Sequence, residues 1–442
     1  MVRQDRDPRQ PAGNSAVRIA TLGCKANQAD SDALAAELIR RGYTIAAVDE
    51  PAAVCVINTC TVTHVADAKA RKLIRRLGRD NPRAAIVVTG CYAERAAQEL
   101  AAIPGVSRVV PNAARDSLAR VIEEVAGAPA RPEPSLPTGP RPARPGSVRA
   151  FVKAQDGCDH HCSYCIVPAA RGPMRSRSVA EVVSEIRRVV EAGAREVVVS
   201  GIRLGAYGEE PQGRGLARLL HAACDIPAAR LRLSSIEPWD VGDELAAEIA
   251  EHPLLCPHLH LPLQSGDDEV LRAMRRPYTI ADYRALVHSL RQRNPDIAVT
   301  TDIMVGFPGE SERAFAHTCS AVEEIGFARA HVFRYSGRPG TTAAAMPDQV
   351  PDEIKAARAH VLSRLAQESA CAFARRFMGR TVPVLFEECA NGVCSGLTDT
   401  YLTAKTSGRP SLVGQVAGVE VRAVESNGIA GELARRQRAE RG

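Results

Sequence analysis

The sequence predicts an α/β protein of several domains: an N-terminal parallel sheet covered by helices, a central partial (β/α)6 barrel and a small C-terminal antiparallel β-barrel. Three observations predict this fold class. Strand-like apolar runs alternate with helical patterns over most of the chain, a segment crowded with Pro and Gly interrupts the alternation, and the last part has only β-branched runs between turn residues. The 442 residues fit about three domains.

The N-terminal domain is predicted over residues 17–125, after a disordered tail at 1–16. Its expected strands and helices alternate along the chain, which predicts a parallel sheet. The expected strands are 19–23, 54–58, 84–90 and 106–110, and the expected helices are 30–41, 65–79 and 93–101. A linker is expected at 126–147, because AGAPARPEPSLPTGPRPARPGS cannot pack a core.

The central barrel is predicted over residues 148–376, where six strand-like runs are separated by helical patterns. The expected strands are 149–153, 196–201, 231–236, 258–263, 299–304 and 329–335. The C-terminal domain is predicted over 377–442. Its runs TVPVLFEEC, YLTAKT and VEVRAVE are separated by Gly, Asn and Asp, as in a small antiparallel β-barrel.

The composition sets the broad class of the protein. With 45% hydrophobic and 24% charged residues it is ordinary for a globular chain, and no run of 18 apolar residues predicts a membrane span. The N-terminus has no apolar signal core, so a cytoplasmic location is expected. The net charge of +6 allows a nucleic-acid partner without requiring one, and 4% aromatic residues argue against broad base-stacking surfaces.

Three cysteines occur together in CDHHCSYC, just after the first predicted barrel strand. Cys158, Cys162 and Cys165 can bind three irons of a cubane cluster and leave the fourth iron open to an amine and carboxylate ligand, such as the methionine end of S-adenosylmethionine (SAM). The loop lies at the barrel face where active sites occur. A zinc site is the alternative, with His160 or His161 as fourth ligand; otherwise these histidines are expected to be solvent-exposed.

Three further cysteines each follow a predicted strand of the N-terminal domain. Cys24, Cys60 and Cys91 lie about 30 residues apart, but the carboxyl ends of parallel strands share one edge of a sheet. We therefore expect them to hold a second cluster, with buried structural thiols as the alternative. Cys55 lies within a strand and is expected in the core. The other cysteines are expected to be structural: Cys224, Cys256, Cys319, Cys371, Cys389 and Cys394.

With both cysteine sets and the motifs TLGCKANQADS, INTCTVT and VTGCYAE, the chain resembles the radical-SAM methylthiotransferases, and among them the MtaB-type tRNA enzymes. The resemblance implies two [4Fe–4S] clusters, bound SAM and a C-terminal TRAM domain that binds RNA. It implies replacement of the C2 hydrogen of N6-threonylcarbamoyladenosine at tRNA position 37 by a methylthio group, with a SAM-derived 5′-deoxyadenosyl radical and a second SAM as methyl donor.

The partners implied are the tRNA anticodon arm and a reduced flavodoxin- or ferredoxin-type electron donor, with no membrane and with the sulfur donor left open. Two alternatives remain at this point. One is a methylthiotransferase for another substrate, either isopentenyladenosine tRNA or a ribosomal protein. The other is a two-cluster electron-transfer protein, which the long barrel argues against.

Residues at or near the ends of the barrel strands are predicted to contact SAM, with Tyr164 on its adenine side by resemblance. The set is Tyr164, Gly201, Gly205, Glu237, Gln264, Ser265, Gly306 and Phe307. Turn glycines, helix caps or core residues are the alternative for all but Tyr164. Basic residues are predicted to bind RNA phosphates, or else to form a solvated surface: Arg171, Arg175, Arg177, Lys69, Arg71 and Lys72. No catalytic residue is predicted beyond the six cluster ligands.

Overall fold

The computed structural model describes residues 15–47, 50–127, 148–209, 211–226 and 230–434. Most of the predicted tail and linker lies outside these residues. The chain forms two compact units, one from Met1–Gly139, Asp156–His160 and Cys165–Met174, the other from Pro140–Gln155, His161–Tyr164 and Arg175–Gly442. Among the described residues, no helix is long and apolar enough to cross a membrane.

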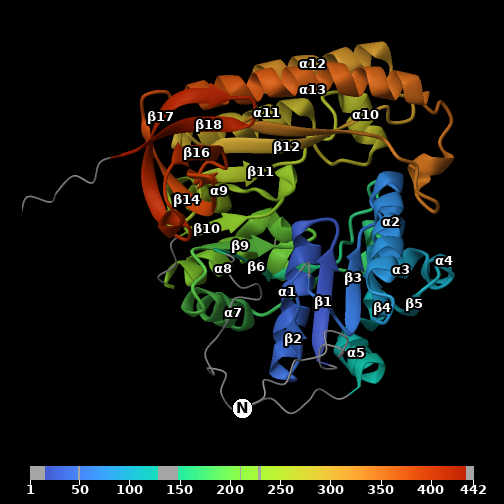
Figure 1. The fold of residues 1–442 in the computed structure, drawn as a ribbon. Helices are drawn as coiled ribbons and strands as arrows, with labels where there is room; N and C mark the ends of the chain where they lie inside the picture. Colours follow the sequence, from blue (N-terminus) through green and yellow to red (C-terminus); the bar gives the residue numbers. More distant parts are fainter. Residues whose placement is uncertain (1–14, 48–49, 128–147, 210, 227–229, 435–442) are drawn as a thin grey trace, which may run out of the picture. The chain divides into compact units, whose positions relative to one another are not determined.

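The first unit contains a five-stranded parallel sheet in the order β2-β1-β3-β4-β5 (Figure 1). Its strands are β1 (Ala16–Thr21), β2 (Thr44–Ile45), β3 (Val54–Thr59), β4 (Ala85–Gly90) and β5 (Val106–Val110). The helices of this unit are α1 (Lys25–Arg40), α2 (His64–Asp80), α3 (Cys91–Arg95), α4 (Ala97–Ala101), α5 (Leu118–Ala126) and α6 (Val167–Arg171).

Both faces of this sheet are covered by helices, because successive strand residues point to opposite sides. In β3, Val54 and Val56 pack with residues of α1 and α5, whereas Cys55 and Ile57 pack with residues of α2, α3 and α4. Cys55 is fully buried, as predicted. The helix expected over 93–101 is two short helices, which meet at Ala96 with φ −141°.

The second unit begins with six parallel strands. They are β6 (Arg149–Lys153), β9 (Glu196–Ser200), β10 (Arg230–Leu233), β11 (His258–His260), β12 (Ala298–Val305) and β13 (Arg329–Arg334). They form two three-stranded sheets, joined by isolated bridges between 231 and 255 and between 235 and 260. The helices that accompany them are α7 (Val179–Glu191), α8 (Arg214–Cys224), α9 (Asp243–Glu251), α10 (Asp268–Ala273), α11 (Ile280–Arg293), α12 (Glu312–Ile325) and α13 (Asp352–Arg375).

The C-terminal strands close into a small barrel in the order β14-β15-β16-β18-β17. They are β14 (Thr381–Ala390), β15 (Val393–Thr398), β16 (Thr403–Ser407), β17 (Val416–Glu425) and β18 (Gly428–Leu433). The predicted fold class is confirmed, with one difference: β16 and β18 pair in parallel, whereas the other pairs are antiparallel. Cys389 and Cys394 lie opposite each other on β14 and β15 and form a disulfide.

A buried ionic cluster lies within the second unit. The Glu196 carboxylate on β9 is fully buried, 2.8 Å from Arg149 Nε, 2.6 Å from Arg230 Nε and 3.1 Å from Arg232 Nη2. The two arginines of β10 also donate hydrogen bonds to the main-chain carbonyls of residues 397–399, at the end of β15 and just after it. The cluster thus connects the parallel strands to the C-terminal barrel.

Candidate active site

The three cysteines of the N-terminal sheet lie at its carboxyl edge. Strand register pairs Thr59 of β3 with Gly90 of β4, so Cys60 and Cys91 follow neighbouring strands at the same level. Cys24 follows β1, and a Cβ atom at the preceding Gly23 would lie 2.7 Å from the Cβ of Cys60. The charges of Cys24 and Cys91 both act on Cys60. The structure therefore brings together the three cysteines that the sequence separates.

Two of these three thiols are buried, and their burial affects their protonation. Cys24 is exposed, whereas Cys60 and Cys91 are buried. Burial raises the pKa of Cys60 to about 11 and also raises the pKa of Cys91. A thiolate in this place therefore requires a cation to stabilise it, and iron or another metal supplies that charge.

The surroundings of Cys91 fit an anionic metal–sulfur group. Asn112 Nδ2 lies 3.6 Å from Cys91 Sγ, and the guanidinium of Arg171 lies beside the same thiol. Arg171 Nε is buried and has no hydrogen-bond partner among the described residues. An unpaired buried N–H costs about 1–3 kcal/mol, so an acceptor bound here would be stabilised. Three thiols with these N–H donors are a suitable ligand set for a [4Fe–4S] cluster.

The position of Arg171 corrects one prediction. Its side chain is 1% exposed and pairs with Asp30 at 3.0 Å and with Asp156 at 2.8 Å, all within the first unit. A guanidinium held in this way cannot reach an RNA phosphate, so the predicted RNA contact of Arg171 is wrong. The sequence shows a basic stretch around this residue but not that the side chain points into the protein.

Gly90, the residue before Cys91, sits in a backbone conformation that favours glycine. Its φ is +97°, and an added Cβ would lie 2.4 Å from the carbonyl oxygen of Thr59. We expect Gly90→Ala to lower the free energy of unfolding by more than the roughly 1–3 kcal/mol of backbone strain alone. Gly105→Ala is the matched control, because Gly105 has φ +91° and open space around it. Equal losses in urea unfolding would show that the neighbouring strand adapts.

The predicted cluster loop spans both units, and each part has its own contacts. In the first unit, Cys158 Sγ lies 3.8 Å from His160 O, and Cys165 Sγ accepts a hydrogen bond from Val167 N at 3.4 Å. In the second unit, Arg276 Nη1 lies 3.7 Å from Cys162 Sγ. Both sets of contacts place N–H or carbonyl groups next to cysteine sulfur.

Tyr164 packs against an apolar cluster that includes Phe307, Met304 and Tyr335. Phe307 is fully buried, with its ring 5.7 Å from that of Tyr335. Two of the residues predicted to contact SAM therefore belong to one group of apolar side chains. A flat adenine ring prefers surroundings of this kind.

Arg276 is a residue that the sequence reasoning missed. It is 5% exposed, donates to Glu237 Oε1 at 3.2 Å, and lies 4.5 Å from the ring centre of Trp239. The predicted SAM ligand Glu237 is thus held by an ion pair. No local signal marks it, because Arg275 and Arg276 stand in a stretch rich in charged residues, GDDEVLRAMRRPYTIADYR. A buried charged side chain, here between α10 and α11, commonly marks a functional site.

The other residues predicted to contact SAM differ in what surrounds them. Gln264 has φ +64°, and its Oε1 is buried without a hydrogen-bond partner, which leaves an acceptor for a ligand. Ser265 caps the turn before α10 through Asp267 N at 3.2 Å. At each of the three glycines, a side chain of the protein occupies the space that a Cβ atom would need. These side chains are Gln155 at Gly201, Asp240 at Gly205 and Lys355 at Gly306.

Within the described ranges, no group of three or more His, Cys, Asp or Glu is arranged to hold a single metal ion. A cubane cluster does not require its three cysteines to surround a single metal ion, because each thiolate binds a different iron.

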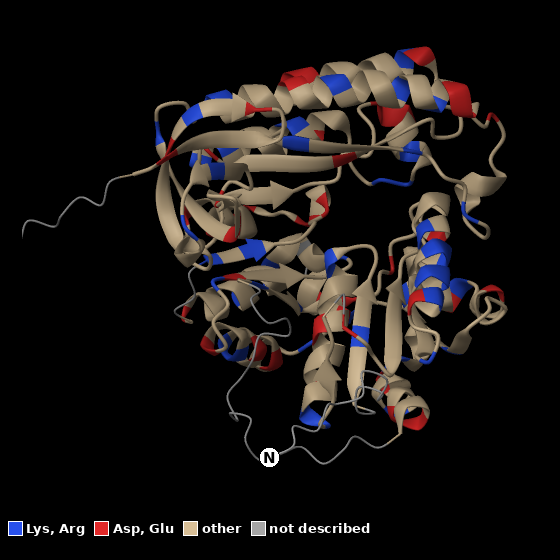
Figure 2. Cartoon of the chain, viewed as in Figure 1, with Lys and Arg blue, Asp and Glu red and all other residues tan. Residues whose placement is uncertain are grey.

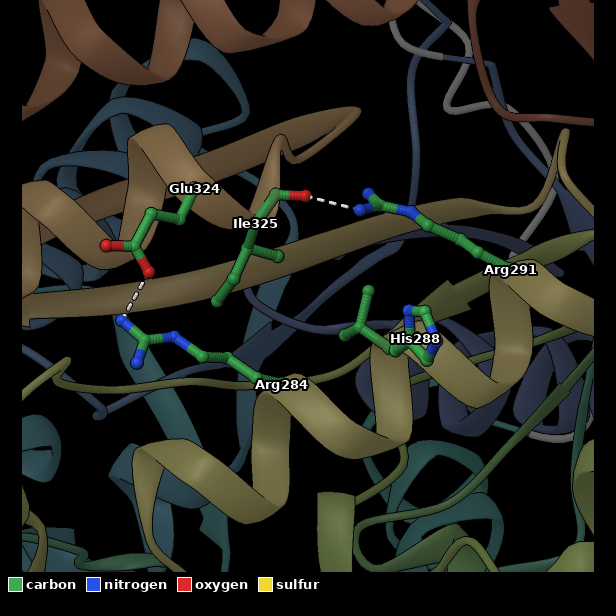
Figure 3. A pocket seen from close by; sticks show the side chains of 6 residues that line it. Arg284, His288, Arg291, Glu324 and Ile325 are labelled. Carbon is green, nitrogen blue, oxygen red and sulfur yellow. Dashed lines mark hydrogen bonds and ion pairs between the residues drawn. The ribbon is translucent and has the colours of Figure 1, made fainter.

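A surface pocket of the second unit is lined by none of the predicted site residues. Between α11 and α12 it is lined by Arg284, His288, Arg291 and the end of α12 (Figure 3). Arg284 pairs with Glu324, and Arg291 donates to the carbonyl of Ile325, so the polar groups that line it are already paired.

The basic residues predicted to bind RNA are only partly available. Lys69 and Lys72 are exposed on α2, where Lys and Arg gather (Figure 2), and Arg175 is exposed too. Arg71 donates to the Tyr92 hydroxyl, and Arg177 pairs with Glu185 at 2.6 Å. The exposed lysines can bind phosphate groups directly, whereas the paired arginines would first have to break their present hydrogen bond or ion pair.

Comparison with known proteins identifies the family. Residues 152–322 match the model of the radical SAM superfamily, and residues 16–111 match uncharacterized protein family UPF0004. The threonylcarbamoyladenosine tRNA methylthiotransferase MtaB of Bacillus subtilis is 36% identical over 91% of this chain and 92% of its own length. The chain belongs to the MtaB-type radical-SAM methylthiotransferases. The MtaB of Thermotoga maritima is 37% identical to this methylthiotransferase, over 93% of this chain and 96% of the relative.

A second branch of the family is about as similar to this methylthiotransferase. The tRNA-2-methylthio-N(6)-dimethylallyladenosine synthase of Maricaulis maris is 36% identical over 94% of this chain and 96% of its own length. Among solved structures, the radical SAM methyltransferase TsrM of Kitasatospora setae has a TM-score of 0.54 at 17% identity, over 86% of this chain and 80% of that chain. At that identity the likeness concerns the fold alone. Membership of the radical SAM superfamily implies one [4Fe–4S] cluster and SAM.

Proposed function

We propose that this methylthiotransferase acts on tRNA and replaces the C2 hydrogen of N6-threonylcarbamoyladenosine at position 37 with a methylthio group. The observation that carries the proposal is the meeting of Cys24, Cys60 and Cys91 at one sheet edge, in a chain that has a separate radical-SAM loop. Cleavage of SAM to a radical requires one cluster. Insertion of sulfur into the substrate requires a second site that can hold sulfur. The names of the MtaB relatives support the nucleoside substrate.

The roles of the residues follow from this proposal. Cys158, Cys162 and Cys165 would hold the cluster that, when loaded, supplies an electron for SAM cleavage. Cys24, Cys60 and Cys91 would hold the second cluster. Tyr164 and Phe307 would pack against the adenine of SAM, and Gln264 Oε1 would accept a hydrogen bond from it. The exposed lysines of α2 and the C-terminal barrel would contact the anticodon arm.

The substrate is tested by nucleoside analysis. Anaerobically reconstituted protein is mixed with SAM, a reduced flavodoxin- or ferredoxin-type donor, and tRNA that carries threonylcarbamoyladenosine, isopentenyladenosine or unmodified adenosine. We expect a methylthio product only from the first tRNA, and label from methyl-labelled SAM in that product. Mass spectrometry of the digested nucleosides measures both.

The other candidate is the isopentenyladenosine enzyme, because a relative of that branch is 36% identical over almost the whole chain. Product from the isopentenyladenosine tRNA alone would overturn the proposed substrate and favour that candidate. A chain that cleaves SAM but modifies none of the three tRNAs would contradict a tRNA substrate altogether.

A further inference from the structure

Two arginines and two aspartates form a buried network behind Cys91. Arg171 Nη1 donates to Asp156 at 2.8 Å, and Arg171 Nη2 donates to Asp30 at 3.0 Å. Arg115 Nη1 contacts the same carboxylates at 2.9 Å and 3.1 Å. Each carboxylate is therefore shared by both guanidinium groups. The network holds Arg171 in a single position, since a carboxylate binds each of its terminal nitrogens.

The same network directs hydrogen-bond donors toward the cysteine. Arg115 Nη2 donates to Asn112 Oδ1 at 2.6 Å, which fixes the amide so that its Nδ2 faces Cys91 Sγ at 3.6 Å. Asn112 Nδ2 also donates to Ala170 O at 2.8 Å. Arg171 stands beside the same thiol with its Nε–H buried and unpartnered within the described residues. A buried donor without an acceptor is uncommon in folded proteins and calls for an explanation.

We propose that Arg171 and Asn112 are positioning residues that donate hydrogen bonds to the sulfur atoms at the Cys91 side of the N-terminal cluster and raise its reduction potential. The inference rests on the proposed second cluster and deepens it. Donors and positive charge next to cluster sulfur stabilise the reduced state, which carries one more negative charge, and so make reduction easier. Arg171 is fitted for this because its aspartate partners do not occupy Nε.

The chain offers a direct test in the Cys158/Cys162/Cys165→Ala background, where only the N-terminal cluster would remain. Arg171→Lys keeps the positive charge between the aspartates but removes the guanidinium donor. Asn112→Ala removes the amide donor without a change of charge. We expect both variants to shift the midpoint potential of that cluster to more negative values, with the larger shift for Arg171→Lys. Potentiometric titration followed by electron paramagnetic resonance measures it.

Arg41→Lys is the matched control, because Arg41 also bridges two carboxylates of the first unit, Glu37 and Glu123, at the opposite end of α1. It should leave the potential unchanged. Iron content and circular dichroism verify that each variant is folded and loaded. If the Arg171→Lys variant does not fold, the midpoint potential of the Asn112→Ala variant still tests the proposal.

Two failures are distinguishable. If the background protein with native Arg171 binds no cluster, the second cluster of the proposed function is wrong. If the cluster is present and the Arg171 and Asn112 variants keep the potential of the Arg41 control, the inference is wrong while the proposed function stands.

Discussion

Replacement of Cys158, Cys162 and Cys165 by alanine is expected to lower bound iron from about eight to about four atoms per chain and to abolish SAM cleavage. The remaining iron would be held by Cys24, Cys60 and Cys91, which the sheet brings together independently of the barrel loop. Iron and sulfide analysis after anaerobic reconstitution measures the first effect. Formation of 5′-deoxyadenosine measures the second, which should fall to the level of a protein-free control.

The reciprocal variant, Cys24/Cys60/Cys91→Ala, should also keep about four irons and should still cleave SAM, but should form no methylthio product. A matched control replaces three half-buried cysteines outside both sets, namely Cys224, Cys319 and Cys371. This control should keep about eight irons. Only about four irons in the unaltered protein would mean that the N-terminal cysteines are structural, and the proposed sulfur insertion would fail with them.

The second large effect is expected at Glu196. Its removal leaves three arginines without their shared buried carboxylate, and breaking a buried ion pair costs about 3–5 kcal/mol. We expect Glu196→Ala to lower the unfolding free energy of the second unit by an amount of that order, measured by denaturant unfolding. The matched control is Glu324→Gln at the exposed pair with Arg284, where the loss should stay below about 1 kcal/mol. Similar losses in both variants would contradict this account.

The Glu196 carboxylate also predicts that the stability of the protein depends on pH. Its three arginine partners outweigh the burial that opposes its charge, and hold the pKa of Glu196 at about 2, below its ordinary 4.5. A depressed pKa contributes stability that is complete above pH 4.5 and is lost as the pH falls toward 2. The shift is worth about 3 kcal/mol. The stability difference between wild type and Glu196→Gln should therefore shrink over this range.

Topology is the part of the site that sequence predicts best. Cysteines that each follow a strand must meet if the strands are parallel, so the group of Cys24, Cys60 and Cys91 could be inferred without coordinates. The parallel direction of the six strands of the second unit followed in the same way from the alternation of strands and helices. The parallel pairing of β16 with β18 could not, because it joins segments that are distant in sequence and no local pattern encodes it.

Side-chain direction is the part that sequence predicts worst. Arg171 was expected on the RNA surface, yet it lies buried among carboxylates, because a basic residue after a loop can point either way. Arg276 was missed for the same reason, since its burial depends on Glu237 and Trp239 from other segments. Asp240 occupies the space beside Gly205, so packing alone requires a glycine there, and its contact with SAM stays a prediction.

The contacts of Arg230 and Arg232 indicate which changes in the sequence of the C-terminal barrel would preserve its attachment to β10. These arginines bind the carbonyls of Leu397, Thr398 and Asp399, and every amino acid presents the same main-chain carbonyl. These three contacts depend only on the path of the main chain, whereas the side chains of Glu387, paired with Arg149 at 3.3 Å, and Tyr401, stacked on His258, also take part in the junction. Residues 397–399 can therefore change during evolution without loss of these three hydrogen bonds, whereas Glu387 and Tyr401 are constrained by the partners of their side chains.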